Sequence, residues 1–343
     1  IFFHLDMSAV NASIRQVYMD ILLSACVAVM LAVIAVSYIT GHITRPVIQM
    51  NSTVKRYTSG NFGLRLKQTT QDELGELAGS FNAMADELDT LEQSRKNFVA
   101  NVSHELRSPL TSMGGFLAAM RDGTVPREEF DKYLDIVIGE QKRMTGMVND
   151  LLDLARIEAG QTVNKMEDFD INEAIRRTLI TFETRINDKK LSVNIGFAQE
   201  ACYVRADSGQ IQQVLRNLID NAIKFSNRGG NLGITTRTGR QSVTVRVEDD
   251  GCGIGPEDRK HIFERFYKAE KAHTPKGGAG TGLGLAIVSR ILQQHEQTIR
   301  VESKLGSGTA FTFTLKKGEQ PGAKRKTQPA DGTGPGGGGK AQK

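Results

Sequence analysis

The first group of residues able to do chemistry is a histidine–glutamate pair that precedes a proline. His104 and Glu105 are adjacent, and Pro109 follows five positions after the histidine in a stretch with helical apolar spacing. A neutral imidazole is nucleophilic near its ordinary pKa of about 6.5, and a neighbouring carboxylate can accept its proton. A proline within a helix removes a hydrogen bond and bends the axis. This pattern fits a nucleophilic histidine on a bent helix, and it fits a surface histidine beside a solvated glutamate equally well.

Two amides and a cation form the second group. Asn217, Asn221 and Lys224 are spaced by four and three residues, which places them on one stripe of the helix predicted over 207–226. The D-x-x-Q pattern over 207–210 is typical of a capping box at the start of that helix. Amide oxygens can bind Mg²⁺ and a lysine can bind phosphate, although the same stripe could also be a solvated face.

The third group is an aspartate followed by alternating glycines at the end of a predicted strand. Asp249 precedes Gly251 and Gly253. Glycines after a strand allow the backbone to approach a ligand closely, and the carboxylate could accept a hydrogen bond from an exocyclic amine. A plain glycine-rich turn would look the same. A Rossmann fingerprint is excluded because Pro256 occupies its last glycine position.

A second glycine segment leads directly into an apolar helix predicted over 286–292. Gly280, Gly282 and Gly284 alternate with Thr281 and Leu283. Glycines that lead into a helix N-terminus expose backbone N–H groups to an anion, and the helix dipole reinforces the attraction. Residues 256–281 before it have the length of a mobile cover over a ligand.

A membrane-spanning helix is predicted ahead of all these groups. No formally charged residue occurs from Ile21 to Thr44, and about 20 helical residues cross a bilayer core of about 30 Å. A buried core helix would usually carry a polar stripe, which this stretch lacks. Residues 45–67 carry five basic and no acidic residues, so the positive-inside rule places the chain after the span in the cytoplasm. The chain begins with Ile1 rather than Met, which indicates a fragment or a processed chain.

Two long helices are predicted next, preceded by a short helical stretch over 46–57. The first follows an a/d repeat of apolar residues from Leu74 to Val102 and runs on to about Asp122. The second covers about 127–159. Neither helix can bury its stripe alone, so a hairpin that dimerises into a four-helix bundle is expected.

The rest of the chain reads as an α+β sandwich. Its predicted helices are 170–187, 207–226 and 286–292, and its predicted strands are near 191–197, 202–206, 243–248 and 311–315. Residues 317–343 hold eight glycines and three prolines, which predicts a disordered tail.

Composition and charge exclude several classes of protein. The 343 residues include only three cysteines, which cannot form a disulfide framework. The net charge of +5 arises from residue 316 onward, where seven basic residues face two acidic ones. The preceding residues are balanced, so a DNA-binding body is excluded and no nucleic-acid partner is expected.

Taken in order, the four groups resemble the transmitter of bacterial sensor histidine kinases over about residues 44–316. The motifs that carry this resemblance are the run 72–84 together with Pro46 (the HAMP relay), 98–111 (the H box), 217–225 (the N box), 249–253 (the first glycine box), 263–267 (the F box) and 280–284 (the second glycine box).

The resemblance implies a role for each matching residue. His104 would be the phosphoacceptor, Glu105 its general base, and Ser108, where the family often has Thr or Asn, would orient a water for dephosphorylation of the partner. Asn221 would hold Mg²⁺ with help from Asn217. The implied nucleotide-binding residues are Asn217, Asn221, Lys224, Asp249 (for the adenine amine), Gly251, Gly253, Arg265, Gly280, Thr281, Gly282, Leu283 and Gly284.

The sequence therefore predicts a multidomain chain with a transmembrane helix, an α-helical coiled-coil or four-helix bundle, and an α+β sandwich that binds ATP. The expected domains are an extracytoplasmic remnant (1–20), a transmembrane helix (21–44), a HAMP domain (45–93), a dimerisation and phosphotransfer domain (94–160), an ATP-binding domain (161–316) and a tail (317–343).

The resemblance implies a homodimeric kinase in the inner (plasma) membrane of a bacterium. It would use ATP and Mg²⁺ to phosphorylate its own histidine, and then transfer the phosphoryl group to an aspartate of a response regulator. Two alternatives remain open: an ATP-driven machine of the same nucleotide-binding fold, and a non-catalytic scaffold that relays membrane signals.

Overall fold

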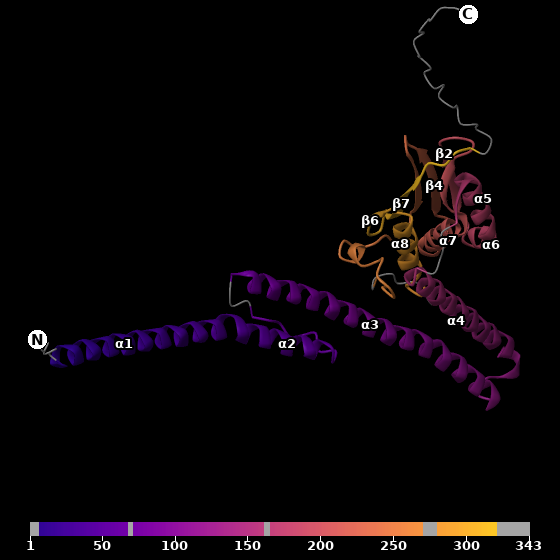
Figure 1. The fold of residues 1–343 in the computed structure, drawn as a ribbon. Coiled ribbons are helices and arrows are strands. Elements are labelled where there is room, and N and C mark those ends of the chain that lie inside the picture. The colour runs from indigo at the N-terminus through magenta and orange to yellow at the C-terminus, as the bar shows by residue number, and fades with distance from the viewer. Residues whose placement is uncertain (1–6, 68–70, 161–164, 270–279, 321–343) are drawn as a thin grey trace, which may run out of the picture. The chain divides into compact units, whose positions relative to one another are not determined.

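The structure is a computed structural model that describes residues 7–67, 71–160, 165–269 and 280–320. The chain divides into two compact units, residues 1–102 and 103–343. Figure 1 shows the elements along the chain. Residues 270–279, which belong to the predicted cover, and 321–343, which form most of the predicted tail, lie outside the described residues.

The N-terminal unit begins with a long apolar helix, as the sequence predicts. Helix α1 (Met7–Ile39) continues through a π-helical turn (Thr40–Thr44) into α2 (Arg45–Tyr57). The π turn has a local cause in Pro46, which lacks the N–H that would bond to the carbonyl of His42. Just before it, the Arg45 N–H bonds to Thr40 O, five residues back, and not to the carbonyl four residues back as in an α-helix. From Asn11 onward the apolar side chains of α1 are exposed, and the helix is long and apolar enough to cross a membrane.

After α2 the chain turns back on itself and enters α3 (Glu73–Arg121). Asn82 of α3 holds the connecting segment, because its side chain accepts from the Leu66 N–H at 2.8 Å and donates to Leu66 O at 2.9 Å. Leu66 packs with Met50 of α2 and Ala78 of α3 in a small buried cluster. Leu66 is thus fixed to both helices.

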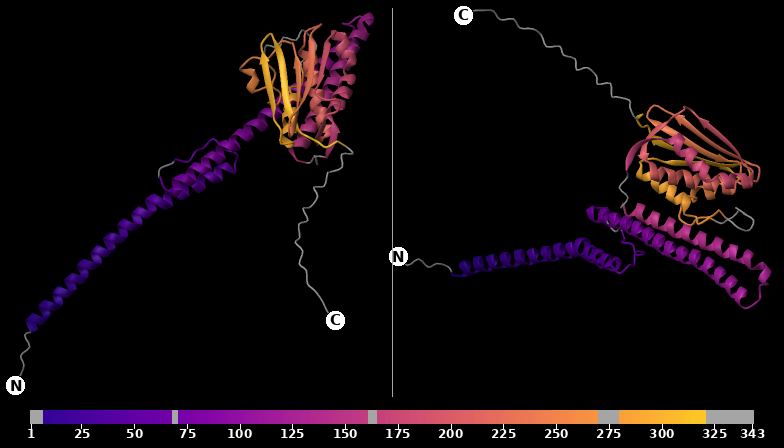
Figure 2. Two further views of the ribbon diagram at one scale, coloured as in Figure 1. Left: turned by 90° about the horizontal axis from the view of Figure 1, so that it is seen from above. Right: turned by 90° about the vertical axis from the view of Figure 1, so that its right-hand side faces the viewer.

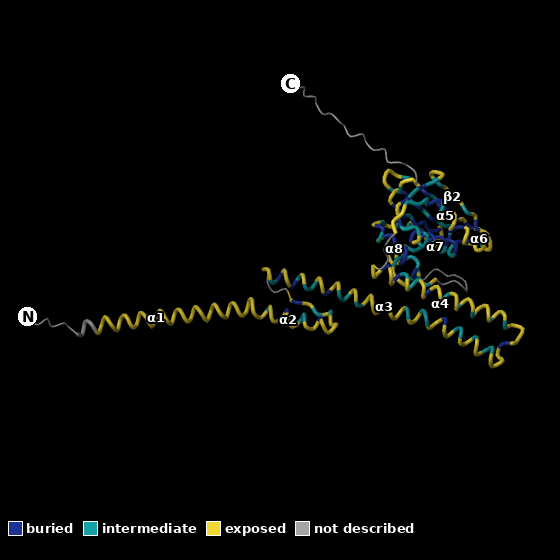
Figure 3. The backbone as a smooth tube through the Cα atoms, turned by 45° about the vertical axis from the view of Figure 1, so that its right-hand side comes forward, coloured by how far each residue is buried: buried dark blue, intermediate teal, exposed yellow. Residues whose placement is uncertain are grey.

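The C-terminal unit opens with a helical hairpin, made of α3 from residue 103 onward and α4 (Phe130–Glu158). The second helix begins three residues later than predicted, because residues 127–129 form a 3₁₀ turn. Gly123 adopts a φ of 82° in the connection, and Val125 is buried there. Figure 3 shows that much of the hairpin surface is exposed in the single chain. Apolar side chains such as Leu110 and Ile138, about half exposed at 54% and 47%, remain available to a partner.

The remaining residues form the predicted α+β sandwich. A five-stranded sheet has the order β2-β4-β5-β7-β6, and β1 pairs with β3 in a separate two-stranded sheet. The helices lie on one side of the strands in both views of Figure 2. The elements are β1 (Met166–Asp170), α5 (Ile171–Thr181), α6 (Glu183–Lys189), β2 (Ser192–Phe197), β3 (Tyr203–Asp207), α7 (Ser208–Phe225), β4 (Asn231–Thr238), β5 (Ser242–Asp249), a 3₁₀ turn (Asp258–Lys260), α8 (Gly284–Gln294), β6 (Ile299–Lys304) and β7 (Gly308–Lys316).

The core lies between the sheet and helices α5, α7 and α8. The predicted core face of α7 is confirmed, since all six of its residues are at most 3% exposed. They are Ile211, Val214, Leu215, Leu218, Ile219 and Ala222. Helix α8 buries Ile287, Val288, Ile291 and Leu292 against the same core. Because α7 and α8 bury their apolar faces, the polar edges of both helices can line a cavity.

Three predictions about this domain need correction. The helix predicted over 170–187 is two helices, α5 and α6, which break at Phe182. Strands β1, β4 and β6 are absent from the predicted strands. In β4 a polar residue, Thr236, occupies a buried position: it is 2% exposed and donates to Asn172 Oδ1 at 3.1 Å. The tail begins later than residue 317, because the N–H groups of Lys317 and Gly318 bond to Gln241 O and Tyr203 O.

Candidate functional site

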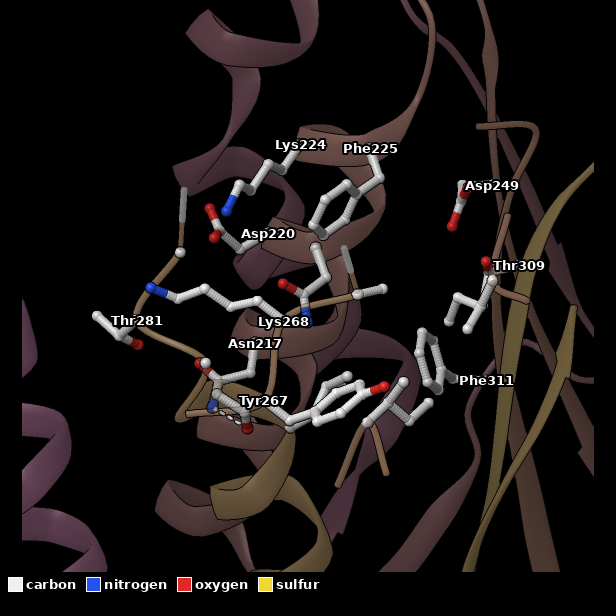
Figure 4. A pocket seen from close by; sticks show the side chains of 18 of the residues that line it. Asn217, Asp220, Lys224, Phe225, Asp249, Tyr267, Lys268, Thr281, Thr309 and Phe311 are labelled. Carbon is white, nitrogen blue, oxygen red and sulfur yellow. Dashed lines mark hydrogen bonds between the residues drawn. The ribbon is translucent and has the colours of Figure 1, made fainter. Parts of the chain in front are cut away.

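A cavity of about 390 Å³ opens between α7, the end of β5, the start of α8 and the loop after the 3₁₀ turn (Figure 4). Nine of the predicted binding residues line it: Asn217, Asn221, Lys224, Asp249, Gly253, Gly280, Thr281, Gly282 and Gly284. Segments distant in sequence therefore meet around one space, as the order of the motifs predicts.

Helix α7 supplies one wall of the cavity, and its start is fixed by a cap. The Asp207 side chain accepts from the Gln210 N–H at 3.0 Å. In a complete capping box the Gln210 side chain would accept from the Asp207 N–H. Here the Asp207 N–H donates to Nε2 of buried His295 at 3.1 Å. His295 Nδ1 lies 2.8 Å from Ile291 O and so carries the ring proton, which leaves Nε2 as the acceptor. Helices α7 and α8 are thus joined at this end.

The predicted stripe of Asn217, Asn221 and Lys224 faces the cavity. Asn217 Nδ2 donates to Gly284 O at 3.2 Å, which joins α7 to the start of α8. The Lys224 ammonium lies at Gly280, where an added Cβ atom would be 2.7 Å from Nζ. Burial lowers the pKa of Lys224, and nearby Asp220 partly opposes that shift. The arrangement offers amide oxygens and a partly desolvated cation at one end of the cavity.

Asp249 stands at the other end, among apolar side chains. Its Oδ1 accepts from the Gly251 N–H at 2.9 Å. Burial raises the pKa of Asp249 to about 6, although hydrogen bonds from the backbone of Gly251 and Thr309 lower it. Phe311 lines the same end, and the Phe225 ring lies between that end and Lys224, whose Nζ is 5.1 Å from the ring centroid (Figure 4). A carboxylate beside aromatic rings can accept a hydrogen bond from the amine of a flat heterocycle packed between them.

The two glycines of the first box lie so close to neighbouring backbone that a side chain would not fit at either position. A Cβ atom on Gly251 would lie 2.2 Å from Phe225 O, and one on Gly253, where φ is 69°, would lie 2.1 Å from Lys304 O. Gly251 is absent from the cavity lining, whereas Gly253 lines it. These glycines therefore let the loop after β5 pass close to the backbone of α7 and β6.

The second glycine box packs against the F box. Gly282 has a φ of 72°, and a Cβ atom there would lie 2.7 Å from the Phe266 backbone, whose N–H donates to Gly282 O at 2.9 Å. Thr281 lines the cavity, and its Oγ1 accepts from the Leu283 N–H at 3.3 Å. Leu283 is fully buried and is absent from the lining. The segment holds Thr281 at the cavity through contacts on either side of it.

Several lining residues escaped the sequence analysis, notably Lys268, Asp150, Tyr267 and Phe311. Tyr267 is the last residue of the F box and Lys268 directly follows it, so the motif itself was the available signal. Asp150 carried no such signal because it belongs to α4, more than a hundred residues from the glycine box, and reaches the cavity only through folding. Thr281 Oγ1 donates to Asp150 Oδ2 at 3.2 Å.

The histidine motif does not line the cavity. His104 and Ser108 are exposed on α3. Glu105 forms an ion pair with Lys268, whose Nζ lies 2.7 Å from Oε1. Arg265, a predicted phosphate contact, is likewise absent from the lining and pairs with Glu158 of α4. The structure thus places the predicted nucleophile and the cavity in separate parts of the C-terminal unit.

Comparison with known proteins gives three consecutive family matches. Residues 38–90 match the HAMP domain, residues 94–160 the His Kinase A (phospho-acceptor) domain, and residues 206–319 the Histidine kinase-, DNA gyrase B-, and HSP90-like ATPase. A solved structure of Acinetobacter baumannii histidine kinase AdeS is 30% identical, with a TM-score of 0.53 over 63% of this chain and 98% of that one. The chain belongs to the bacterial two-component sensor histidine kinases.

Other sensor kinases are similar over long stretches. Sensor histidine kinase YclK of Bacillus subtilis is 31% identical over 90% of this chain and 66% of its own length. Sensor protein SrrB of Staphylococcus aureus is 38% identical over 67% of this chain and 39% of its own length. The chain therefore spans less than two thirds of these curated relatives. Histidine kinase ThkA, solved in complex with response regulator protein TrrA, gives a TM-score of 0.55 at 28% identity over 68% of this chain and 66% of that one.

The family matches agree with the elements of this sensor kinase. The HAMP match covers the end of α1, α2 and the start of α3, and the phospho-acceptor match covers the α3–α4 hairpin that carries His104. The ATPase match contains α7, both glycine boxes and the whole five-stranded sheet except β2. The residues that line the cavity, Asp150 apart, lie within the segment that matches the ATPase family, and that match supports ATP use. The HAMP match with the apolar helix α1 is typical of a membrane-anchored sensor.

Proposed function

We propose that this chain is an ATP-dependent protein-histidine kinase that phosphorylates His104 and passes the phosphoryl group to an aspartate of a response regulator. The observation that carries the proposal is the polarity of the cavity: the half-buried Asp249 carboxylate and Phe311 at one end, and Lys224 with two amides at the other. An adenine ring fits the first end and a triphosphate fits the second.

The cavity residues would hold the nucleotide as follows. Asp249 would accept a hydrogen bond from the adenine amine, and Lys224, Thr281 and the backbone of Gly280 and Gly282 would bind the phosphates. Asn221 and Asn217 would hold Mg²⁺; the fit is supported by their amide oxygens, which are hard ligands at the cavity end that also carries the cation. Bound there, the metal supplies charge neutralisation for phosphoryl transfer.

His104 would act as the nucleophile. A nitrogen of the neutral imidazole forms a bond to the γ-phosphorus while the bond from that phosphorus to the ADP oxygen breaks. Glu105 would accept the proton from the other ring nitrogen. In the present arrangement Lys268 holds the Glu105 carboxylate, so this ion pair has to open before Glu105 can serve as a base.

His104 must also reach a cavity that it does not line. The ATP-binding domain would therefore swing as a rigid body on the bundle between nucleotide binding and transfer. Ser108, one helical turn along α3 from His104, has a hydroxyl that could orient a water and give the same chain a phosphatase activity toward its partner.

The wider organisation is part of the proposal. The kinase would be a homodimer in the inner (plasma) membrane of a bacterium, with domains over 1–20, 21–44, 45–93, 94–160 and 161–316 and a tail that begins after Gly318. Everything after Arg45 would be cytoplasmic. The exposed apolar side chains of the hairpin support dimerisation, and the basic residues after the span support the topology. An ATP-driven machine or a non-catalytic scaffold is not favoured, because the three family matches occur together.

Substitution of the nucleophile tests the proposed function. His104→Gln is expected to abolish incorporation of the γ-phosphoryl group of ATP as an acid-labile adduct while nucleotide affinity stays unchanged, because His104 does not line the cavity. The measurement is autophosphorylation of the solubilised chain with labelled ATP, alongside nucleotide binding. His42→Gln is the matched control, since it removes a histidine outside the phospho-acceptor domain. Undiminished labelling of the His104 variant would reject that residue as the acceptor.

A further inference from the structure

Lys189, the last residue of α6, makes an unusual set of contacts with the end of α7. Its Nζ donates to three backbone carbonyls: Ile223 at 2.8 Å, Lys224 at 2.8 Å and Ser226 at 3.0 Å. The residue is half-buried. An ammonium group has three N–H donors, so these carbonyls use all of them.

The end of α7 is a place where a cation is favourable. The last carbonyls of a helix have no partner within it, and they form the negative end of the helix dipole. Burial lowers the pKa of Lys189, and nearby Arg185 lowers it further, so carbonyls rather than a carboxylate offset the cost of burial. A backbone contact adds to the link, because the Gly229 N–H donates to Lys189 O at 2.8 Å.

The turn of α7 that Lys189 holds is the turn that faces the ATP site. Asn221, Lys224 and Phe225 all line the cavity, and Figure 4 shows the Lys224 and Phe225 side chains leaving the same end of the helix. The loop after β5 packs closely on the same turn, since a Cβ atom on Gly251 would lie 2.2 Å from Phe225 O. A shift of this turn would move the cation, the aromatic wall and the Asp249 loop together.

We propose that Lys189 is a positioning residue for nucleotide binding, which fixes the last turn of α7 so that Lys224 and Phe225 face the nucleotide. The inference rests on the proposed function, namely that this cavity takes ATP, and adds a residue that lies outside the cavity. Its role is geometric: the ammonium group ties the three carbonyl oxygens of Ile223, Lys224 and Ser226 into one arrangement, and Lys189 is absent from the cavity lining.

The test compares Lys189→Met with Lys190→Met in the solubilised full chain. The neighbouring Lys190 is exposed, so its variant matches the loss of charge without loss of the carbonyl contacts. Lys189→Met is expected to raise KM for ATP about tenfold, equivalent to about 1.4 kcal/mol, with kcat at saturating ATP within about twofold because the nucleophile and its base are untouched. Lys190→Met is expected to leave both constants unchanged.

A third variant separates positioning from stability. Ile175→Val trims the core of the same domain away from the cavity, lowers the unfolding temperature, and should leave KM unchanged. If Lys189→Met is too unstable to purify, Lys189→Gln keeps two N–H donors and should raise KM about threefold. Wild-type affinity for ATP in either surviving variant overturns the inference. If the unsubstituted chain binds no ATP, the proposed function fails first, so the two failures are distinguishable.

Discussion

At the scale of single residues, Asp249 is costly to the nucleotide-free protein. Burial raises its pKa to about 6 from an ordinary value of 3.8, so the folded protein binds this proton more tightly than the unfolded chain. Stability therefore falls as the pH rises from about 4 to about 6, and the loss is fully present above that window. A site that holds a carboxylate among aromatic rings at neutral pH exchanges stability for recognition.

Asp249→Asn tests that exchange. The amide oxygen can still accept from the Gly251 N–H, but the charge is gone. ATP binding is expected to weaken by about 1.5–3 kcal/mol, the range for a hydrogen bond to a charged group. The nucleotide-free variant is expected to be more stable than the parent at pH 8, by at most about 2–3 kcal/mol. Calorimetric binding and thermal unfolding at pH 8 and pH 4.5 measure both effects.

The pH dependence provides the control for this variant. Its stability advantage should shrink as the pH falls below about 6, because Asp249 of the parent then becomes protonated. ATP binding to the parent should weaken over the same window. An advantage that is the same at both pH values would show that the carboxylate charge is not its source.

At the scale of elements, periodicity predicts what a helix buries better than where strands pair. The core face of α7 followed from its apolar spacing, and all six residues are buried. Strand β4 escaped prediction because two of its positions are Gly233 and buried Thr236, which interrupt the apolar alternation. Asp150 escaped because it enters the site through a contact with another element rather than through a motif of its own. Tertiary contacts of this kind leave no local signal.

The heptad of α3 gives a prediction at this scale. Leu91 is 66% exposed in the single chain, and Leu88 lies on the same apolar repeat. Replacing both with Glu should disrupt the homodimer, because two buried charges per helix would have to be desolvated without partners. Light scattering of the solubilised chain measures the mass. The matched control is Thr90→Glu with Gln93→Glu, which adds the same charge off the repeat. An unchanged mass for the leucine variant would contradict the coiled-coil prediction.

At the scale of the whole C-terminal unit, carboxylates of the helical hairpin meet donors of the ATP-binding domain. Four such contacts join the described residues: Glu105 with Lys268, Asp150 with Thr281, Asp153 with Gln213, and Glu158 with Arg265. Lys268 and Thr281 line the cavity. In this arrangement Thr281 and Lys268 already hold carboxylates, so a nucleotide has to compete with the hairpin for them.

Asp150→Asn is expected to relieve that competition. Burial raises the pKa of Asp150, and neighbouring Asp153 and Asp220 raise it further, which shows that a negative charge is disfavoured at this point of the cavity. The amide can still accept from Thr281, but it no longer repels phosphates. Affinity for ATP should rise about fivefold, which corresponds to about 1 kcal/mol of Coulombic repulsion near a surface. Because the effect acts on charge, affinity for adenosine should stay the same, and the gain for ATP should diminish at high salt.

Asp153→Asn is the control, since Asp153 bonds to Gln213 and is absent from the cavity lining. An equal gain for adenosine and ATP would mean that Asp150 acts by shape rather than by charge, and no gain at all would mean that the hairpin does not compete with the nucleotide.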